Sequence, residues 1–371
     1  MARVRKSDPA ETRSGAMPLT ILNVSYPLAT VTDDAAGGAE QVLAMLDQAI
    51  VRNGHRSLVI APNGSKCQGR LIATEKVSGV LDDSAKRLAR LLHREAIRKT
   101  LLNFDVDLVH LHGIDFPEYF PDADLPKVVT LHLPCEWYAA DALQSRPRTY
   151  YICVSNSQKR TCAANASIHR VVENGVRFPE PLSKRNKLAR PFVLGMGRIC
   201  PEKGLHLAMD AARECGIRFL LAGTVYEYPE HRWYFEKEIR PRLQQGHRFL
   251  GSVGSKRKNQ LLSDALCLLV PSLAPETSSL VAMEAMSHGT PVVAFRAGAL
   301  CEIVDDGRTG FLVDSVEQMS EAIANIQQIN PAECRRQAER RFSVTRMTDE
   351  YLALYRQIAV LRQPAPSELE S

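Results

Sequence analysis

The sequence lacks any hydrophobic run as long as the roughly 18–20 residues that a membrane-spanning helix requires. Its first 18 residues are polar and lack the apolar stretch of a secretory signal peptide, so we expect residues 1–18 to be a disordered tail. Together these two absences favour a cytoplasmic protein.

The nine cysteines include no Cys-x-x-Cys pair and follow no regular spacing. Several lie in or beside apolar stretches, where a small thiol fits well, so we expect structural, reduced cysteines. Internal repeats and low-complexity segments are absent too. What is present is ordinary for a globular protein, with 45% hydrophobic and 24% charged residues. The net charge of +5 favours anionic ligands or a membrane surface over a dedicated nucleic-acid surface.

A chain of 371 residues is long for one doubly wound α/β unit and suits two. Short, continuous apolar runs alternate with amphipathic segments, as expected for parallel strands that are covered on both faces. We predict strands over residues 19–24, 57–61, 108–112, 128–133 and 151–154, and then over 192–197, 219–222, 267–270 and 291–295. Helices are predicted over residues 40–52, 83–102, 204–214 and 280–288.

Between residues 179 and 191 the pattern lapses into proline, lysine and arginine, which we interpret as a linker. The sequence therefore predicts two Rossmann-like domains in tandem, over residues 19–185 and 186–345. A C-terminal segment, residues 346–371, is expected to hold a helix that could return to the first domain, followed by a tail.

Ligands of open α/β sheets bind at the carboxyl ends of the strands, so the loops there are the places to search for chemistry. Arg198 and Lys203 follow the first strand of the second series, and Pro201 suits the first turn of a helix. A helix N-terminus with two cations favours a diphosphate. Two solvated cations at a surface turn would give the same pattern.

A later loop carries Glu276 and Glu284 in a Glu-x7-Glu spacing, the first before a predicted helix and the second inside it. Seven intervening residues make roughly two helical turns, so both carboxylates can face one ligand site. No lysine or arginine adjoins either glutamate in the sequence, so a routine surface ion pair does not explain them. Carboxylates suit neighbouring hydroxyl groups, as in a sugar or a ribose.

Two glycines are further candidates. Gly298 follows the next strand and would let the backbone approach a ligand closely, although a plain turn is an equal explanation. Gly38 opens the first helix of the chain, where backbone amides can face a phosphate or an acceptor, and a flexible helix entry is the alternative.

Residues 195–313 resemble the signature of the retaining family-4 glycosyltransferases of the GT-B fold. The resemblance rests on the two cations after the strand, the Glu-x7-Glu spacing, and the segments Gly-Thr-Pro-Val-Val and Asp-Gly-x-Thr-Gly. The segment Gly-Gly-Ala-Glu at 37–40 and the strand ends at His112 and His132 agree with it, so the resemblance spans nearly the whole chain from residue 19.

The resemblance implies roles for these residues. Arg198 and Lys203 would bind the donor diphosphate, and Glu284 would bind the nucleotide ribose. Glu276 would lie beside the donor sugar, whose hydroxyls the next amides hold, at Ser278, Ser279 and Leu280. The sequence departs from the commoner pattern at residues 277–279, where Thr-Ser-Ser stands in place of Phe-Gly, so the identity of the donor sugar is left open.

His132 is similar to the histidine with which this family contacts the donor sugar. Taken from the residues alone, a single histidine at a strand end is more often structural, and we interpret His110 and His112 as structural. Two Asp-x-Asp pairs, at 105–107 and 122–124, imitate the metal motif of the other major glycosyltransferase fold, but neither follows the carboxyl end of a strand. We therefore predict no metal and no cofactor, with the two cations stabilising the leaving diphosphate.

The sequence thus predicts a retaining transferase that moves a sugar from a UDP- or GDP-sugar to a hydroxyl acceptor, with the acceptor on residues 19–185 and the donor on residues 186–345. A nucleotide-sugar epimerase or hydrolase on the same fold, and an inactive GT-B binding scaffold, are the alternatives. The acceptor is left open among glycan, lipid-linked and small-molecule classes.

A basic segment over residues 86–99 places Leu88, Leu91, Leu92 and Ala96 at helical spacing. Such a helix can lie against anionic lipid at the inner face of a membrane. An ordinary helix that packs on its sheet with a solvated basic face is the alternative.

Overall fold

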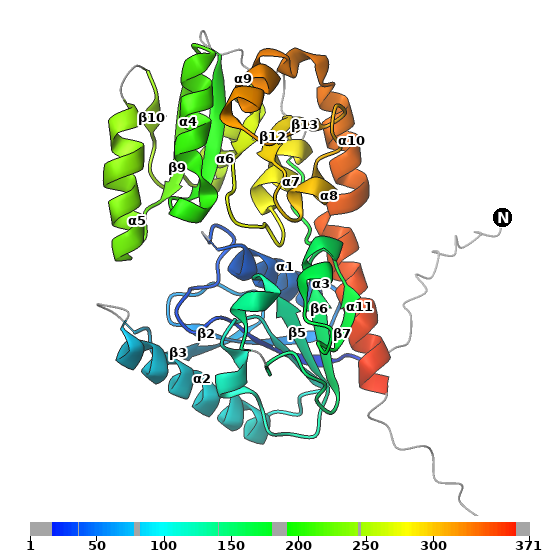
Figure 1. Cartoon of the computed structure of the whole chain (residues 1–371). Coiled ribbons are helices and arrows are strands. Elements are labelled where there is room, and N and C mark those ends of the chain that lie inside the picture. The colour runs from blue at the N-terminus through cyan, green and yellow to red at the C-terminus, as the bar shows by residue number, and fades with distance from the viewer. Residues whose placement is uncertain are drawn as a thin grey trace, which may run out of the picture.

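The computed structural model describes residues 17–35, 37–77, 82–139, 141–179, 191–243 and 246–360. The chain forms two α/β units, the N-terminal one below and the C-terminal one above in Figure 1, each built on a parallel sheet with helices against it. The predicted fold class of two Rossmann-like units is confirmed. The predicted tail and linker fall almost entirely outside the described residues.

Within the described residues, the N-terminal sheet has seven parallel strands in the order β3-β2-β1-β4-β5-β6-β7. They are β1 (Thr20–Val24), β2 (Arg56–Pro62), β3 (Arg70–Thr74), β4 (Leu108–Leu111), β5 (Lys127–Leu131), β6 (Thr149–Cys153) and β7 (Ile168–Val171). The connections contain α1 (Gly38–Arg52), α2 (Asp83–Asn103), η1 (Phe116–Tyr119), η2 (Cys135–Trp137) and α3 (Asn156–Thr161).

The C-terminal sheet has six strands in the described residues, in the order β10-β9-β8-β11-β12-β13. They are β8 (Phe192–Arg198), β9 (Arg218–Thr224), β10 (Arg248–Phe249), β11 (Leu268–Val270), β12 (Val292–Phe295) and β13 (Gly310–Val313). The helices and turns that follow them are η3 (Pro201–Lys203), α4 (Leu205–Glu214), α5 (Pro229–Tyr234), η4 (Phe235–Ile239), η5 (Arg240–Leu243), α6 (Ser255–Asp264), α7 (Leu280–Ser287), α8 (Leu300–Ile303), α9 (Val316–Ala324) and η6 (Ile326–Gln328).

Burial on both faces explains which strands the sequence predicted. All four residues of β4 are buried, as are all five of β5, so these strands read as continuous apolar runs. The four strands that the sequence analysis did not predict, β3, β7, β10 and β13, lie at the sheet edges. Strand β3 is exposed or half-buried at four of its five residues, so it carries no continuous apolar run.

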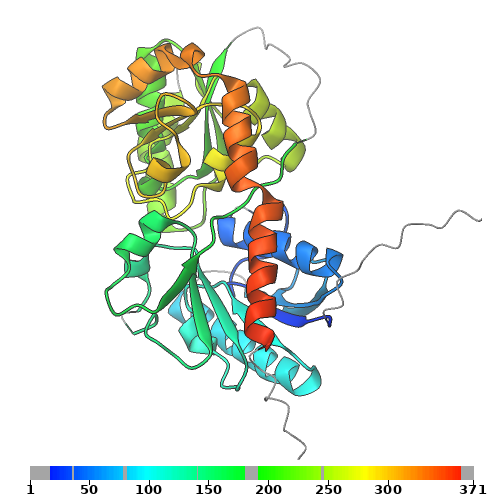
Figure 2. The ribbon, with the colours of Figure 1, turned by 90° about the vertical axis from the view of Figure 1, so that its right-hand side faces the viewer.

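The last two helices cross from one unit to the other. Helix α10 (Pro331–Phe342) buries Cys334, Ala338 and Phe342 in the C-terminal core. Helix α11 (Val344–Val360) follows directly and packs on the N-terminal unit, as Figure 2 shows. None of the helices in the described residues combines the length and the apolar character that crossing a bilayer requires.

A buried chain of hydrogen bonds holds α11 to the N-terminal sheet. His110, on β4, contacts the Tyr355 hydroxyl through Nδ1 at 2.6 Å and the Thr130 hydroxyl through Nε2 at 2.7 Å. Thr130 in turn contacts the Tyr351 hydroxyl at 2.8 Å. Every polar atom named here has a partner, so the network stabilises the contact without the cost of unpaired buried groups.

We predict that Tyr355→Phe lowers the free energy of unfolding by about 1–3 kcal/mol, because it leaves the buried Nδ1 of His110 without a partner. Denaturant unfolding measures this. Tyr228→Phe is the control, since Tyr228 is 40% exposed and should change stability by less than about 0.5 kcal/mol. Equal effects of the two substitutions would contradict the role given to this network.

Candidate functional site

The candidate residues gather where the carboxyl ends of both sheets face each other. Loops after β8, β11 and β12 come from the C-terminal unit, and loops after β1, β4 and β5 come from the N-terminal unit. Direct contacts join the two sides: Thr277 Oγ1 donates to the carbonyl of His132 at 2.9 Å, and Ser255 Oγ contacts the Asp34 carboxylate.

The loop after β8 holds the two predicted cations. Arg198 ends the strand and is exposed, and its guanidinium group makes no hydrogen bond or ion pair with the residues that the structure describes. Lys203 ends the short turn η3, and Gly204 then adopts a left-handed conformation at φ 58° before α4 begins. The helix therefore starts one residue later than the sequence predicted, at Leu205 rather than Gly204, and Pro201 lies in η3 rather than in its first turn.

Glu276 lies beside Lys203. The lysine Nζ is 2.5 Å from Glu276 Oε1, and the Ser272 hydroxyl also donates to that oxygen. The carboxylate side chain is only 9% exposed. The predicted diphosphate and sugar residues are thus brought together, and one cation and one carboxylate neutralise each other.

Gly298 fixes the backbone of Glu276. It has φ 59°, and a Cβ at this position would lie 2.3 Å from the Glu276 carbonyl oxygen. Ala299 N–H donates to the same carbonyl at 2.7 Å. The close approach that the glycine allows is thus to the protein backbone, and its contact with a ligand stays a prediction.

Glu284 lies inside α7 and has its own cation, Lys258 of α6, whose Nζ is 2.6 Å from Glu284 Oε1. Each glutamate therefore has a basic partner although no lysine or arginine adjoins either one in the sequence, because both partners come from distant parts of the chain. Lys258 is 26 residues before Glu284, and no sequence spacing signals that the two helices pack together.

The start of α7 faces the same site. Ser278 Oγ is buried and has no hydrogen-bond partner among the described residues. Ser279 caps the helix without a side-chain hydrogen bond, and α7 begins at Leu280, so the amides of its first turn have no partner within the helix. These unpaired donors suit the oxygen atoms of a ligand.

His132 approaches from the N-terminal unit, directly after β5. Its Nε2 is 3.0 Å from Nδ1 of His112, and the two rings are stacked at 5.3 Å between centroids. Burial lowers the pKa of His132 to about 4, so the ring is neutral near pH 7. His112, which the sequence analysis interpreted as structural, therefore touches a site residue.

Helix α1 adds two neighbours. Gly38 packs against Leu280, since a Cβ there would lie 3.3 Å from Leu280 Cδ1. Glu40, which sequence reasoning left without a role, is only 6% exposed. Burial raises the pKa of its carboxyl group, and the positive charge of Arg198 in the C-terminal unit opposes that rise.

The basic helix α2 does not bury the face that its leucine spacing indicates. Helix α2 buries Ala89, His93, Ile97 and Thr100, and leaves Leu88 and Leu91 50% and 61% exposed. Apolar side chains thus stand on the solvent side of this helix among its cations.

The two Asp-x-Asp pairs are the metal motifs that the sequence analysis considered. Asp107 accepts a hydrogen bond from Thr20 N–H at 2.7 Å and precedes β4, and Asp124 forms an ion pair with Arg148. Both Asp-x-Asp pairs therefore lie at the amino ends of strands, away from the site. Other groups of three possible ligands in the described residues are Cys135 with Cys153 and Cys162, and Cys200 with Glu202 and His231. The absence of a metal requirement stays a prediction.

The expectation of reduced cysteines was wrong for one pair. Cys135 and Cys162 form a disulfide across 27 residues, while seven other cysteines are free. The pairing depends on how η2 packs against α3, which the irregular spacing of the cysteines does not reveal.

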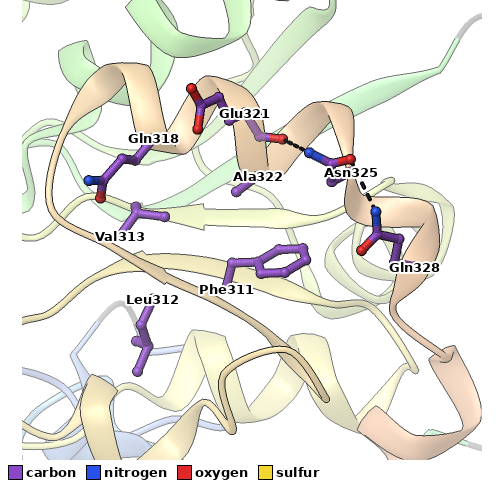
Figure 3. Close-up of a pocket in the computed structure, with 8 residues that line it drawn as sticks. All are labelled: Phe311, Leu312, Val313, Gln318, Glu321, Ala322, Asn325 and Gln328. Atoms are coloured by element: carbon purple, nitrogen blue, oxygen red, sulfur yellow. Dashed lines mark hydrogen bonds between the residues drawn. The ribbon is translucent and has the colours of Figure 1, made fainter.

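A hollow of about 350 Å³ lies apart from these residues, between β13 and α9 (Figure 3). Its lining residues are Phe311, Leu312, Val313, Gln318, Glu321, Ala322, Asn325 and Gln328. Because this lining has one carboxylate and no cation, it does not suit a diphosphate.

Two family models match the chain. The model of glycosyl transferases group 1 matches residues 190–328, and that of glycosyltransferase family 4 matches residues 36–178. A phosphatidyl-myo-inositol mannosyltransferase of Mycobacterium leprae is 26% identical over 310 residues, which are 76% of this chain and 80% of that protein.

Solved structures agree on the fold. AviGT4, a glycosyltransferase involved in avilamycin A biosynthesis, has a TM-score of 0.69 and 25% identity, covering 92% of this chain and 98% of its own. Anabaena HepE in complex with UDP and glucose has a TM-score of 0.72 and 20% identity, covering 90% of this chain and 98% of its own.

We predict that stability falls as the pH drops below about 6.5, and that His112→Leu reduces this fall. Burial holds the pKa of His112 well below its ordinary value, whereas the unfolded chain takes up a proton at a pKa of about 6.5. The unfolded state then binds more protons, so each pH unit below that value costs up to about 1.4 kcal/mol until the folded pKa is reached.

Urea unfolding of both proteins at pH 7, 6 and 5 measures the difference. Because His112 is hydrogen-bonded to His132, the difference between the two profiles reports the titration of His112 together with its effect on His132. Parallel profiles would show that His112 is not held neutral by the fold.

Proposed function

This chain belongs to the family-4 glycosyltransferases of the GT-B fold, and we propose that it transfers a sugar from a nucleotide-diphosphate donor to a hydroxyl acceptor with retention of the anomeric configuration. The donor is a UDP- or GDP-sugar. A neighbour in fold, HepE, binds UDP, which supports a nucleotide-sugar donor here.

The observation that carries the proposal is the convergence of Arg198, Lys203, Glu276 and Glu284 at one boundary between two sheets. Arg198 has no ion-pair partner among the described residues, so a donor diphosphate can form an ion pair with it without breaking an existing one. Lys203 lies 2.5 Å from Glu276 and can hold a phosphate oxygen while it keeps that carboxylate in place.

Glu284 would bind the ribose. Lys258 contacts one of its oxygens at 2.6 Å, so the partly buried carboxylate is charge-compensated and the second oxygen can accept from a hydroxyl group. The unpaired Ser278 hydroxyl and the amides of Ser279 and Leu280 would serve the sugar.

In the reaction, the bond between the anomeric carbon and the diphosphate breaks with oxocarbenium character. Arg198 and Lys203 stabilise the negative charge that develops on the leaving diphosphate. Glu276 is paired with Lys203, which makes it a poor nucleophile, so we propose attack from the front face, with the leaving phosphate accepting the proton of the acceptor hydroxyl. Neutral His132 acts as a hydrogen-bonding group at the sugar.

Two alternatives give different outcomes. An epimerase or hydrolase on this fold would consume donor in the absence of any acceptor. An inactive scaffold would bind a partner and need none of the four charged residues, whereas Lys203 pairs with Glu276 here, and Glu284 has its own cation in Lys258.

The acceptor lies on the N-terminal unit in this proposal, among glycan, lipid-linked and small-molecule classes. Exposed Leu88 and Leu91 beside the cations of α2 support peripheral contact with anionic lipid at the inner face of a membrane. The name of the mycobacterial relative, a phosphatidyl-myo-inositol mannosyltransferase, is consistent with a lipid-linked acceptor.

We predict that one of UDP, GDP or their sugars raises the thermal unfolding midpoint in the presence of EDTA, and that Arg198→Ala and Lys203→Ala suppress this rise. Each substitution should lower kcat/KM about 10²–10³-fold, since it removes a charge that stabilises the leaving group. Arg213→Ala is the matched control, because Arg213 is exposed on α4 and pairs with Asp210. A normal rate for the Arg198 and Lys203 variants would contradict the proposed donor site.

We also predict that the double substitution Leu88→Ser and Leu91→Ser weakens binding to anionic phospholipid vesicles without lowering stability, since both side chains are at least half exposed. Vesicle cosedimentation measures binding, and vesicles of neutral lipid are the control. Unchanged binding of the double variant would show that α2 does not contact the membrane.

A further inference from the structure

The two neutral histidines at the boundary, His112 and His132, are joined by one hydrogen bond. His112 Nδ1 and His132 Nε2 are 3.0 Å apart, which is a hydrogen-bond distance, so one nitrogen carries the hydrogen and the other offers a lone pair. Burial lowers the pKa of both rings, so each carries a single proton near pH 7. The tautomer of one ring therefore fixes the tautomer of the other.

The surroundings of His112 decide which of the two rings donates the hydrogen bond. The ring is 2% exposed, and its Nε2 is buried with no partner among the described residues. A buried N–H without an acceptor is rare in folded proteins, and rarer than a buried acceptor that lacks a donor. The tautomer with hydrogen on Nδ1 avoids such an N–H, because the only N–H of His112 then points at His132.

His110 cannot compete for that hydrogen. Its ring lies 4.0 Å from the His112 ring, centroid to centroid, but both of its nitrogens are occupied by the hydroxyls of Tyr355 and Thr130. His110 therefore restricts the position of the His112 ring through packing and leaves the hydrogen bond to His132 undisturbed.

We propose that His112 is a positioning residue that makes His132 a hydrogen-bond donor through Nδ1. His132 Nε2 accepts from His112, so its own hydrogen lies on Nδ1, which has no hydrogen-bond partner among the described residues. The Thr277 hydroxyl, bonded to the His132 carbonyl at 2.9 Å, holds this residue at the domain boundary. Resting on the proposed function, the inference assigns the partner of Nδ1–H to an oxygen atom of the donor sugar or diphosphate.

The direct test is the tautomer itself. Long-range ¹⁵N–¹H correlation spectra of histidine-labelled protein near pH 7.5 distinguish a hydrogen on Nδ1 from one on Nε2. We expect both His112 and His132 to carry it on Nδ1. A hydrogen on Nε2 of His132 would overturn the inference, whatever the activity of the protein.

Two substitutions separate positioning from packing. His112→Asn keeps an N–H close to the place of Nδ1, whereas His112→Leu removes it. With a nucleotide sugar that the wild type turns over, we expect His112→Leu to lower kcat about 10-fold or more with little change in KM, and His112→Asn to recover most of the loss. The Nδ1–H signal of His132 should be lost in the first variant and kept in the second.

Tyr355→Phe is the control, because it disturbs the same buried cluster through His110 and leaves the contact between His112 and His132 intact. It should lower stability without changing kcat or the His132 spectrum. Equal loss of kcat in His112→Leu, His112→Asn and Tyr355→Phe would show that the ring serves packing alone. If the wild type turned over no donor, the proposed function would fail, and the spectra would still decide the tautomer.

Discussion

Parallel strands impose the constraint on which the site depends. One parallel strand can follow another only through a crossover, so every loop that follows a strand leaves the sheet at the same edge. With two such sheets facing each other, the loops that carry Arg198, Glu276 and His132 meet at one boundary. The α10–α11 pair sets this arrangement, because it packs first on the C-terminal core and then on the N-terminal unit.

The charges at this boundary are organised in pairs. Lys203 compensates Glu276, and Lys258 compensates Glu284, which allows two carboxylates to lie in a partly buried site without mutual repulsion. Arg198 is the exception among these residues, since it has no partner in the described part of the chain. A dianionic ligand would therefore find one free cation and one shared cation, together with unpaired donors at the start of α7.

The sequence predicted the elements whose signals are local. Buried central strands such as β4 and β8 read as apolar runs, and the helices α1, α2, α4 and α7 were found within two residues of their ends. The edge strand β3 was missed because four of its five residues are exposed or half-buried, so it has no continuous apolar run. The sequence predicted His112 at the end of a strand, and it directly follows β4, but its contact with His132 depends on the pairing of β4 with β5 in the sheet.

The residues of the site also divide into those with a local signal in the sequence and those whose contacts depend on packing. Arg198, Lys203, Glu276 and Glu284 follow strands or lie in a helix at recognisable spacings, so they could be selected from the sequence. Lys258 could not, because its contact with Glu284 arises only when α6 and α7 pack together. The disulfide between Cys135 and Cys162 depends in the same way on packing between distant segments.

A crystal structure of the chain with its tightest-binding nucleotide sugar, grown in EDTA, tests the central claim most directly. We expect the diphosphate against Arg198 and Lys203, the ribose on Glu284, and the sugar between Glu276 and His132. A nucleotide found elsewhere, for example in the hollow between β13 and α9, or one that leaves Arg198 and Glu284 untouched, would contradict the account.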